Sequence, residues 1–204
     1  LRGKADGIVT MVVTSELSAA YNAAMTAKEM FPNIPVEVID SRLATMAMGF
    51  GVIAAAKAAA AGGSMEQVIK AARDIFARVH LFFVLDTLDY LRRGGRVTLP
   101  AAVIDILLQV KPILTLQDGK VVPAGRPRTR PKALETLLSL MRKNVTDTPL
   151  HVAVMHGDDP EGAEYLKQEV ASRFDCKELL VTAFTPVMGA HTGPGLLGFA
   201  FYNE

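Results

Sequence analysis

Residues 189–195 read Gly-Ala-His-Thr-Gly-Pro-Gly, a segment in which three glycines surround a histidine and a hydroxyl. Glycine lets backbone amides crowd around a small anion, and His191 and Thr192 add side-chain hydrogen-bonding groups. A short helix beginning after His191 would direct further amides, including that of Gly193, toward the same anion. The pattern predicts an anion site, and a glycine-rich turn that simply reverses the chain explains it equally well.

Three arginines surround a glycine turn at residues 92–96. The planar guanidinium is the natural partner of a carboxylate or a phosphate. Arg92 and Arg93 also fit the solvated, basic end of a helix, which the helix dipole favours. Arg96 follows the turn and precedes a strongly apolar stretch, so it is the stronger candidate for an anion ligand.

Two further candidates carry a weaker signal. Arg126, Arg128 and Arg130 form a second basic run, which predicts a solvated loop or a patch for an acidic partner. Ser18 is expected one turn into the first helix, just past the C-terminal end of a strand, where open α/β sheets place ligands. A serine at such a position more often has a minor structural role.

The sequence carries no recognised catalytic signature. It has no G-x-S-x-G elbow and no Walker A motif, and His151 and His156 lack the spacing of metal ligands. Residues 193–198 match G-x-G-x-x-G, but they lie too near the end of the chain for a dinucleotide-binding βαβ unit. We therefore expect no catalytic residue, no metal and no cofactor.

Composition bounds the class of protein. The 22 basic and 21 acidic residues nearly cancel, which argues against a nucleic-acid surface. Half of the 204 residues are hydrophobic, which is enough for a sizeable core. No segment reaches the roughly 18 uncharged apolar residues of a membrane span, so we expect no stable membrane insertion. The single cysteine, Cys176, excludes an intramolecular disulfide and fits a reducing, cytoplasmic location.

The first part of the chain alternates between strand and helix patterns. Apolar, β-branched runs predict strands at residues 8–13, 36–39 and 81–85. Hydroxyl and carboxylate residues predict helix starts at residues 14–15, 40–41 and 64–67, the last with capping-box spacing. These helices are expected to end near residue 30, at residues 62–63 and near residue 80. The alternation favours a parallel sheet.

The second part mixes hairpin and alternating patterns. Short helices are expected at residues 87–93, closed by Gly94 and Gly95, and at residues 99–108. Strands at residues 113–116 and 120–123 flank an Asp-Gly step, which is a strong hairpin signal. Further helices are expected at residues 131–143 and 160–174, and further strands at residues 151–155, 178–183 and 197–202.

We therefore expect an α/β fold in two lobes. Residues 1–80 form the remainder of a parallel-sheet N-terminal lobe, and residues 81–204 form a mixed-sheet C-terminal lobe. The first strand begins within a few residues of Leu1, and about three strands make a thin parallel sheet. We expect the N-terminal lobe to be truncated, or completed by a segment absent from this chain.

The motifs together resemble the DegV family. Two runs carry most of the resemblance: Leu-Asp-Thr-Leu-x-Tyr-Leu-x-x-Gly-Gly-Arg at residues 85–96 and Gly-x-His-Thr-Gly-Pro-Gly at residues 189–195. The matching segments keep the family's order and span nearly the whole chain: residues 14–18, 39–41, 85–96, 111–114, 118–119, 128–129 and 189–195.

The resemblance implies two α/β lobes that enclose one long-chain fatty acid, in a protein that is not itself an enzyme. In bacteria with a fatty acid kinase, such proteins resemble FakB subunits, which present the bound acyl chain for phosphorylation and carry away the acyl phosphate. Ser18, Arg96 and His191 match the family's residues near the carboxylate, with Thr192 and Gly193 beside them. The acyl chain itself is expected in a tunnel lined by apolar side chains.

Kinase docking is expected at Arg126, Arg128 and Arg130. The chain departs from the family in having Ser-Ala-Ala-Tyr at residues 18–21, where Ser-Gly-Thr-Tyr is usual, and in lacking an earlier segment whose Thr-Ser loop supplies another carboxylate ligand. Two alternatives remain open. One is a hydrolase of acyl phosphate or acyl ester with Ser18 as nucleophile and His191 as base, and the other is a carrier or regulator that binds a different acidic partner.

Overall fold

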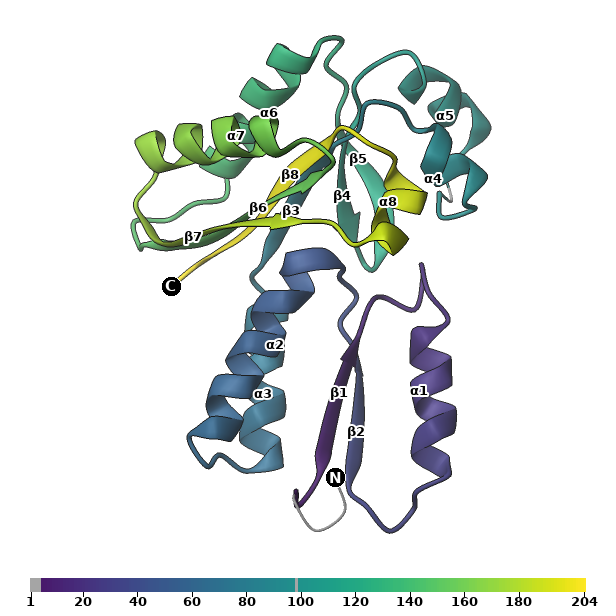
Figure 1. Ribbon diagram of the computed structural model, residues 1–204, viewed down its shortest axis with the longest axis vertical. Helices are drawn as coiled ribbons and strands as arrows, with labels where there is room; N and C mark the ends of the chain where they lie inside the picture. Colours follow the sequence, from purple (N-terminus) through teal and green to yellow (C-terminus); the bar gives the residue numbers. More distant parts are fainter. Residues whose placement is uncertain (1–4, 98) are drawn as a thin grey trace. The chain divides into compact units, whose positions relative to one another are not determined.

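The computed structural model describes residues 5–97 and 99–204, and the chain divides into two compact units, Leu1–Arg78 and Val79–Glu204, here called unit 1 and unit 2. Figure 1 labels the helices and strands of both units. Unit 1 contains a small parallel sheet and unit 2 a larger mixed sheet. The predicted α/β fold class is therefore confirmed.

Unit 1 places helices on both sides of a two-stranded parallel sheet (Figure 1). Its elements are β1 (Ile8–Val12), α1 (Ala20–Glu29), β2 (Val36–Asp40), α2 (Thr45–Ala60) and α3 (Met65–Phe76). β1 pairs with β2 from Ile8↔Val36 to Val12↔Asp40, so the two strands end at the same edge. The apolar cluster of this unit combines β1 with α2 and α3 through Val9, Met11, Ala55, Val68 and Ala72.

Two helix starts differ from the prediction. α1 and α2 begin several residues later than expected, and neither has a side-chain cap. The residues expected to cap them bind other loops: Ser15 Oγ donates to Asp40 Oδ2 at 2.6 Å, and Ser41 Oγ donates to the Val12 carbonyl at 2.7 Å. Hydroxyl and carboxylate side chains bond nearby backbone groups as readily as they cap helices, so the local pattern is ambiguous.

The capping box at the start of α3 is confirmed. Ser64 Oγ accepts the Gln67 amide hydrogen at 3.3 Å, and Gln67 Oε1 accepts that of Ser64 at 2.8 Å. α3 ends at Phe76, before the expected end near His80. His80 instead opens a strand that pairs in the sheet of unit 2, so the expectation of about three strands in the first lobe is wrong.

Unit 2 is built on a six-stranded mixed sheet with the strand order β5-β4-β3-β8-β6-β7. The strands are β3 (His80–Val84), β4 (Ile113–Gln117), β5 (Lys120–Gly125), β6 (Leu150–Gly157), β7 (Cys176–Ala183) and β8 (Leu196–Asn203). Neighbours run antiparallel, apart from the parallel pair of β6 and β7. The helices are α4 (Asp89–Arg93), α5 (Ala101–Leu107), α6 (Arg130–Arg142), α7 (Pro160–Arg173) and α8 (Pro186–Thr192).

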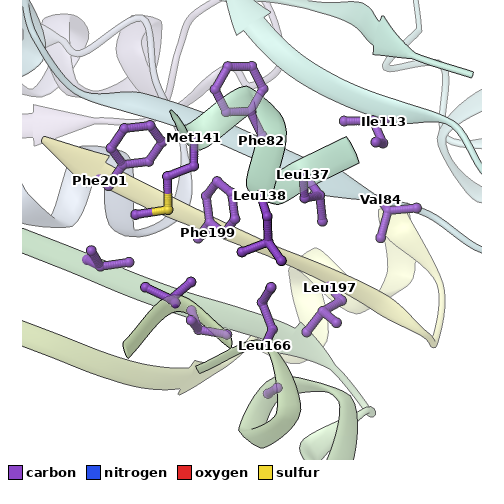
Figure 2. Packing of buried hydrophobic residues seen from close by; sticks show 14 of the residues in the cluster. Phe82, Val84, Ile113, Leu137, Leu138, Met141, Leu166, Leu197, Phe199 and Phe201 are labelled. Atoms are coloured by element: carbon purple, nitrogen blue, oxygen red, sulfur yellow. The ribbon is translucent and has the colours of Figure 1, made fainter. Parts of the chain in front are cut away.

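One face of this sheet carries the hydrophobic core of unit 2 beneath α6 and α7 (Figure 2). Phe199 and Phe201 project from β8 toward Leu137 and Met141 of α6, and Leu166 of α7 closes the same cluster. The two phenylalanine rings meet edge to face, with centroids 5.6 Å apart and an interplanar angle of 72°. This packing fixes the sheet whose edge carries the candidate site.

The predicted hairpin and the short helices expected at residues 87–93 and 99–108 are confirmed in unit 2, whereas α8 was not predicted. Asp118 at φ 50° and Gly119 at φ 81° form the tight hairpin between β4 and β5, as predicted from the Asp-Gly step. No helix begins directly after His191, because α8 ends at Thr192 and β8 follows from Leu196. His191 therefore lies at the carbonyl end of a helix and not ahead of its amide end.

Candidate functional site

The motif residues of unit 2 gather at one edge of its sheet. β3 and β6 both run antiparallel to β8, so the C-terminal ends of β3 and β6 share an edge with the start of β8. The loop after β3 leads into α4, the loop after β6 leads into α7, and the turn after α8 leads into β8. Ligands of α/β sheets commonly bind at such an edge, outside the carboxyl ends of the strands.

Glycines at this edge allow α4 and α8 to pack closely. A Cβ atom added to Gly94 would lie 2.7 Å from His191 Nδ1, and one added to Gly193 would overlap the ring of Tyr90. Gly193 also adopts a φ of 76°, in the left-handed region that favours glycine. These two glycines therefore hold the helices together, which is a packing role that the sequence pattern did not reveal.

Arg96 and His191 both lie against Gly94. α4 ends in a Schellman motif, in which the Gly95 amide donates to the Arg92 carbonyl at 3.1 Å and the Arg96 amide donates to the Leu91 carbonyl at 3.2 Å. The Arg96 Nη1 group then donates to the Gly94 carbonyl at 2.7 Å. The structure thus brings together the two residues predicted from separate motifs.

The imidazole of His191 has an unsatisfied nitrogen. Its Nδ1 atom is buried and has no hydrogen-bond partner among the residues that the structure describes. An unsatisfied buried polar atom costs about 1–3 kcal/mol, so such an atom in a native protein calls for an explanation. His191 lies in the last turn of α8, where the ring faces the end of α4 at Gly94.

The hydroxyl of Thr192 and the backbone amide of Gly193 both donate hydrogen bonds within the chain. The Thr192 side chain is buried and donates to the Met188 carbonyl at 2.9 Å, and the Gly193 amide donates to the Gly189 carbonyl at 2.8 Å. The Gly195 amide donates to the Gly157 carbonyl at 2.7 Å. These donors shape the end of α8 and do not form the cradle of amides that the glycine spacing suggested.

The second basic run does not behave as one surface. Arg126 and Arg128 are exposed, whereas the side chain of Arg130 is only 26% exposed. Arg130 donates to the Gly195 carbonyl at 2.6 Å and forms an ion pair with Asp159. Asp159 was not singled out from the sequence, because it lies far from Arg130 along the chain and belongs to no motif.

The loops that follow β1 and β2 form a second candidate region, in unit 1. Ser18 lies two residues before α1 and not one turn into it, and Ser18 Oγ accepts the Ala20 amide hydrogen at 3.2 Å. Asp40 joins the two loops by accepting hydrogen bonds from the Ser15 side chain and from the Ser15 and Arg42 amides. The carboxylate of Asp40 thereby holds the loop between β1 and α1, which contains Ser18.

Electrostatics supports an ionised Asp40. Burial acts to raise the pKa of its carboxyl, but hydrogen bonds from Ser15 and Arg42, together with the charge of Arg42, lower that pKa below the ordinary 3.8. Burial and the nearby Asp175 instead raise the pKa of the Cys176 thiol, which disfavours a reactive thiolate. The described residues contain no cluster of His, Cys, Asp or Glu suited to a metal ion.

In the part of the chain that the structure describes, no helix has the length and apolar character needed to cross a membrane.

The family model described as "Uncharacterised protein, DegV family" matches residues 1–204. A DegV domain-containing protein of Streptomyces coelicolor is 40% identical over 195 residues, which make up 95% of this chain and 69% of that protein.

Solved structures give the same result. A DegV family protein of Thermus thermophilus, described by its fatty acid binding, is 32% identical with a TM-score of 0.91, over 98% of this chain and 72% of that one. DegV of Bacillus subtilis, described as a fatty acid binding protein, is 31% identical with a TM-score of 0.88, over 98% of this chain and 71% of that one. The chain belongs to the DegV family.

Proposed function

We propose that this chain binds a single long-chain fatty acid and presents its carboxylate to a fatty acid kinase for phosphorylation. The observation that carries the proposal is its likeness to two DegV proteins described as fatty acid binding, each above 30% identity and with a TM-score near 0.9. The hydrolase alternative is not favoured, because these relatives are described as binding proteins.

Arg96 and His191 supply the chemistry for the carboxylate in this proposal. The Arg96 guanidinium and a His191 ring nitrogen can both donate to a carboxylate, and hydrogen bonds to an ionised group are about twice as strong as neutral ones. Both residues lie against Gly94 at the sheet edge. The unsatisfied Nδ1 atom supports a ligand-dependent adjustment of this ring.

Ser18 is the proposed ligand from unit 1. Its Oγ accepts the Ala20 amide hydrogen, which leaves the hydroxyl hydrogen available to donate to a carboxylate oxygen. The acyl chain provides most of the affinity, because each buried methylene contributes about 0.8 kcal/mol. The polar donors offset the cost of removing the carboxylate from water and thereby select for an acid.

Lipid extraction followed by mass spectrometry tests the binding step directly. Purified protein is expected to release one fatty acid per chain and to show the matching mass increase under native conditions. Protein that stays empty after incubation with oleate and palmitate would contradict fatty acid binding by this chain.

The head-group assignment is tested by comparing a fatty acid with the corresponding fatty alcohol. Arg96→Met and His191→Gln are each expected to weaken acid binding about tenfold, the scale of one charge-assisted hydrogen bond, and to leave alcohol binding nearly unchanged. Arg92→Met is the matched control, since Arg92 is in the same helix end but pairs with Asp89 at 3.2 Å. Equal acid affinity in all four proteins would remove Arg96 and His191 from the site.

Arg126 and Arg128 are the proposed docking residues for the kinase, and the engaged guanidinium of Arg130 is not part of that surface. Replacing both with alanine is expected to slow acyl phosphate formation by an added kinase without changing fatty acid affinity. Lys143→Ala, just beyond the other end of α6, serves as the control for lost charge. An unchanged rate in the double variant would place docking elsewhere.

A further inference from the structure

Four charged side chains surround the turn between α8 and β8: Asp86, Lys111, Arg130 and Asp159, here called the Arg130 cluster. Arg130 Nη1 donates to the Gly195 carbonyl at 2.6 Å and lies 3.5 Å from Asp86 Oδ1, while its Nη2 donates to Asp159 Oδ2. Lys111 Nζ donates to the same Asp86 oxygen at 3.0 Å. Two cations and two anions balance, so the cluster is a closed network and not a patch that attracts an anion.

Arg130 connects three loops that are distant in the sequence. Asp86 lies between β3 and α4, Asp159 caps α7 by accepting the Gly162 amide hydrogen at 3.0 Å, and Gly195 ends the turn after α8. Gly195 adopts a φ of 78°, and a Cβ atom there would overlap the Asp86 carboxylate. The turn therefore has to lie directly against Asp86, where the guanidinium reaches its carbonyl.

The connected loops are the ones that lead to Arg96 and His191. α4 begins at Asp89, just after Asp86, and α8 ends at Thr192, just before Gly195. We propose that Arg130 is a positioning residue for the head-group site, which fixes the adjoining ends of α4 and α8 so that Arg96 and His191 meet the carboxylate in one geometry. This inference rests on the proposed fatty acid function.

The chemistry requires arginine at this position. A guanidinium donates in fixed directions from two nitrogens, and here one serves the Gly195 carbonyl while the other serves Asp159. The ammonium of lysine is a single point charge on a flexible stem, so it satisfies one acceptor well and leaves the other without its planar partner. Arg130→Lys is therefore expected to keep the positive charge and to lose the simultaneous hydrogen bonds to the Gly195 carbonyl and to Asp159.

The test is the discrimination ratio, defined as the Kd of a fatty alcohol divided by the Kd of the fatty acid with the same chain. Wild-type protein is expected to prefer the acid, Arg130→Met to lose about tenfold of that preference, and Arg130→Lys to lose about threefold. Alcohol affinity should change little in either variant, because the acyl chain site is left intact. Lys132→Met, which removes an exposed charge from the same helical turn, is expected to match wild type.

Asp159→Asn provides a second variant in case Arg130→Met does not fold, because it weakens the ion pair and keeps an oxygen to cap α7. It is expected to lower the ratio about threefold, and the double variant with Arg130→Lys should show a non-additive loss. An unchanged ratio in the variants, or an equal loss of acid and alcohol affinity, would overturn the positioning role. A wild-type protein that binds the alcohol as tightly as the acid would instead overturn the carboxylate site itself.

Discussion

The two units bury apolar side chains to different extents. In unit 2, α6 and α7 cover a sheet face on which Phe199 and Phe201 are fully buried. In unit 1, every residue of β1 is partly exposed, and the cluster that β1 joins has Val68 and two alanines as its buried members. Stabilisation by burial grows with the apolar area removed from water, so we expect the cluster on β8 to contribute more to stability than the cluster on β1.

The units also differ in how they tie those loops together. Unit 2 uses a guanidinium, Arg130, which donates to the Gly195 carbonyl and to Asp159. Unit 1 uses a carboxylate, Asp40, which accepts from Ser15 and Arg42 and can be protonated. The group that joins the loops therefore accepts hydrogen bonds in unit 1 and donates them in unit 2.

The largest expected effect is in the core of unit 2. Phe199→Ala removes a fully buried ring that packs against Phe201, and it is expected to lower the free energy of unfolding by about 3–5 kcal/mol. Urea unfolding monitored by circular dichroism measures the loss. A cost below about 1 kcal/mol would show that the core of unit 2 repacks freely and would remove the contrast between the units.

The core of unit 2 was also the part best anticipated from sequence. The strands and helices after residue 113 alternate regularly, and an Asp-Gly step marks their hairpin, so pattern and turn chemistry agree. α8 was not anticipated, because seven residues with a proline and a glycine give no helical periodicity.

The candidate site was predictable residue by residue but not as a geometry. Arg96 and His191 follow from the chemistry of their types, whereas their meeting at Gly94 depends on a sheet edge that joins distant loops. Arg130 was assigned to an exposed run because its acceptors, Asp159 and the Gly195 carbonyl, are invisible to local sequence. Ser15 was assigned to a cap because a hydroxyl serves caps and loop contacts equally.

The next effect concerns Asp40 and pH. Its folded pKa is lowered below 3.8, so its stabilising contribution is complete above the unfolded pKa and is lost as pH falls through the folded pKa. Asp40→Asn is expected to cost about 2 kcal/mol at neutral pH, the scale of hydrogen bonds to a charged group. Protonation of Asp40 destabilises the wild-type protein below about pH 4, and the variant should lack this part of the acid destabilisation because asparagine does not titrate.

Urea unfolding of wild type and Asp40→Asn between pH 3 and pH 7 measures both expectations. The two curves of stability against pH should converge toward the acid end of the range, because protonation removes in wild type what the substitution has already removed. Parallel curves would show that Asp40 makes no pH-linked contribution to stability. They would contradict the inference that the loop contacts of unit 1 depend on an ionised carboxylate.

A smaller effect is expected in the core of unit 1. Val68→Ala removes two methyl groups from a buried position on α3, at about 0.8 kcal/mol each, so the expected cost is about 1.5 kcal/mol. Amide hydrogen exchange should show the loss first in α3 and β1, since locally weak regions open before the whole molecule unfolds. A cost equal to that of Phe199→Ala would mean that unit 1 is packed as firmly as unit 2.

The smallest effect is a test of local structure alone. Ser64→Ala removes the hydroxyl that accepts the Gln67 amide hydrogen, and loss of such a cap costs about 1 kcal/mol. Ser172→Ala near the end of α7 is the control, because its hydroxyl donates to the Glu169 carbonyl and caps no amide. Because α3 packs against β1, fraying at Ser64 should raise hydrogen exchange in β1 and leave β8 protected. Equal changes in both strands would show that the two units open as one, and the difference between their cores would then have no consequence for local stability.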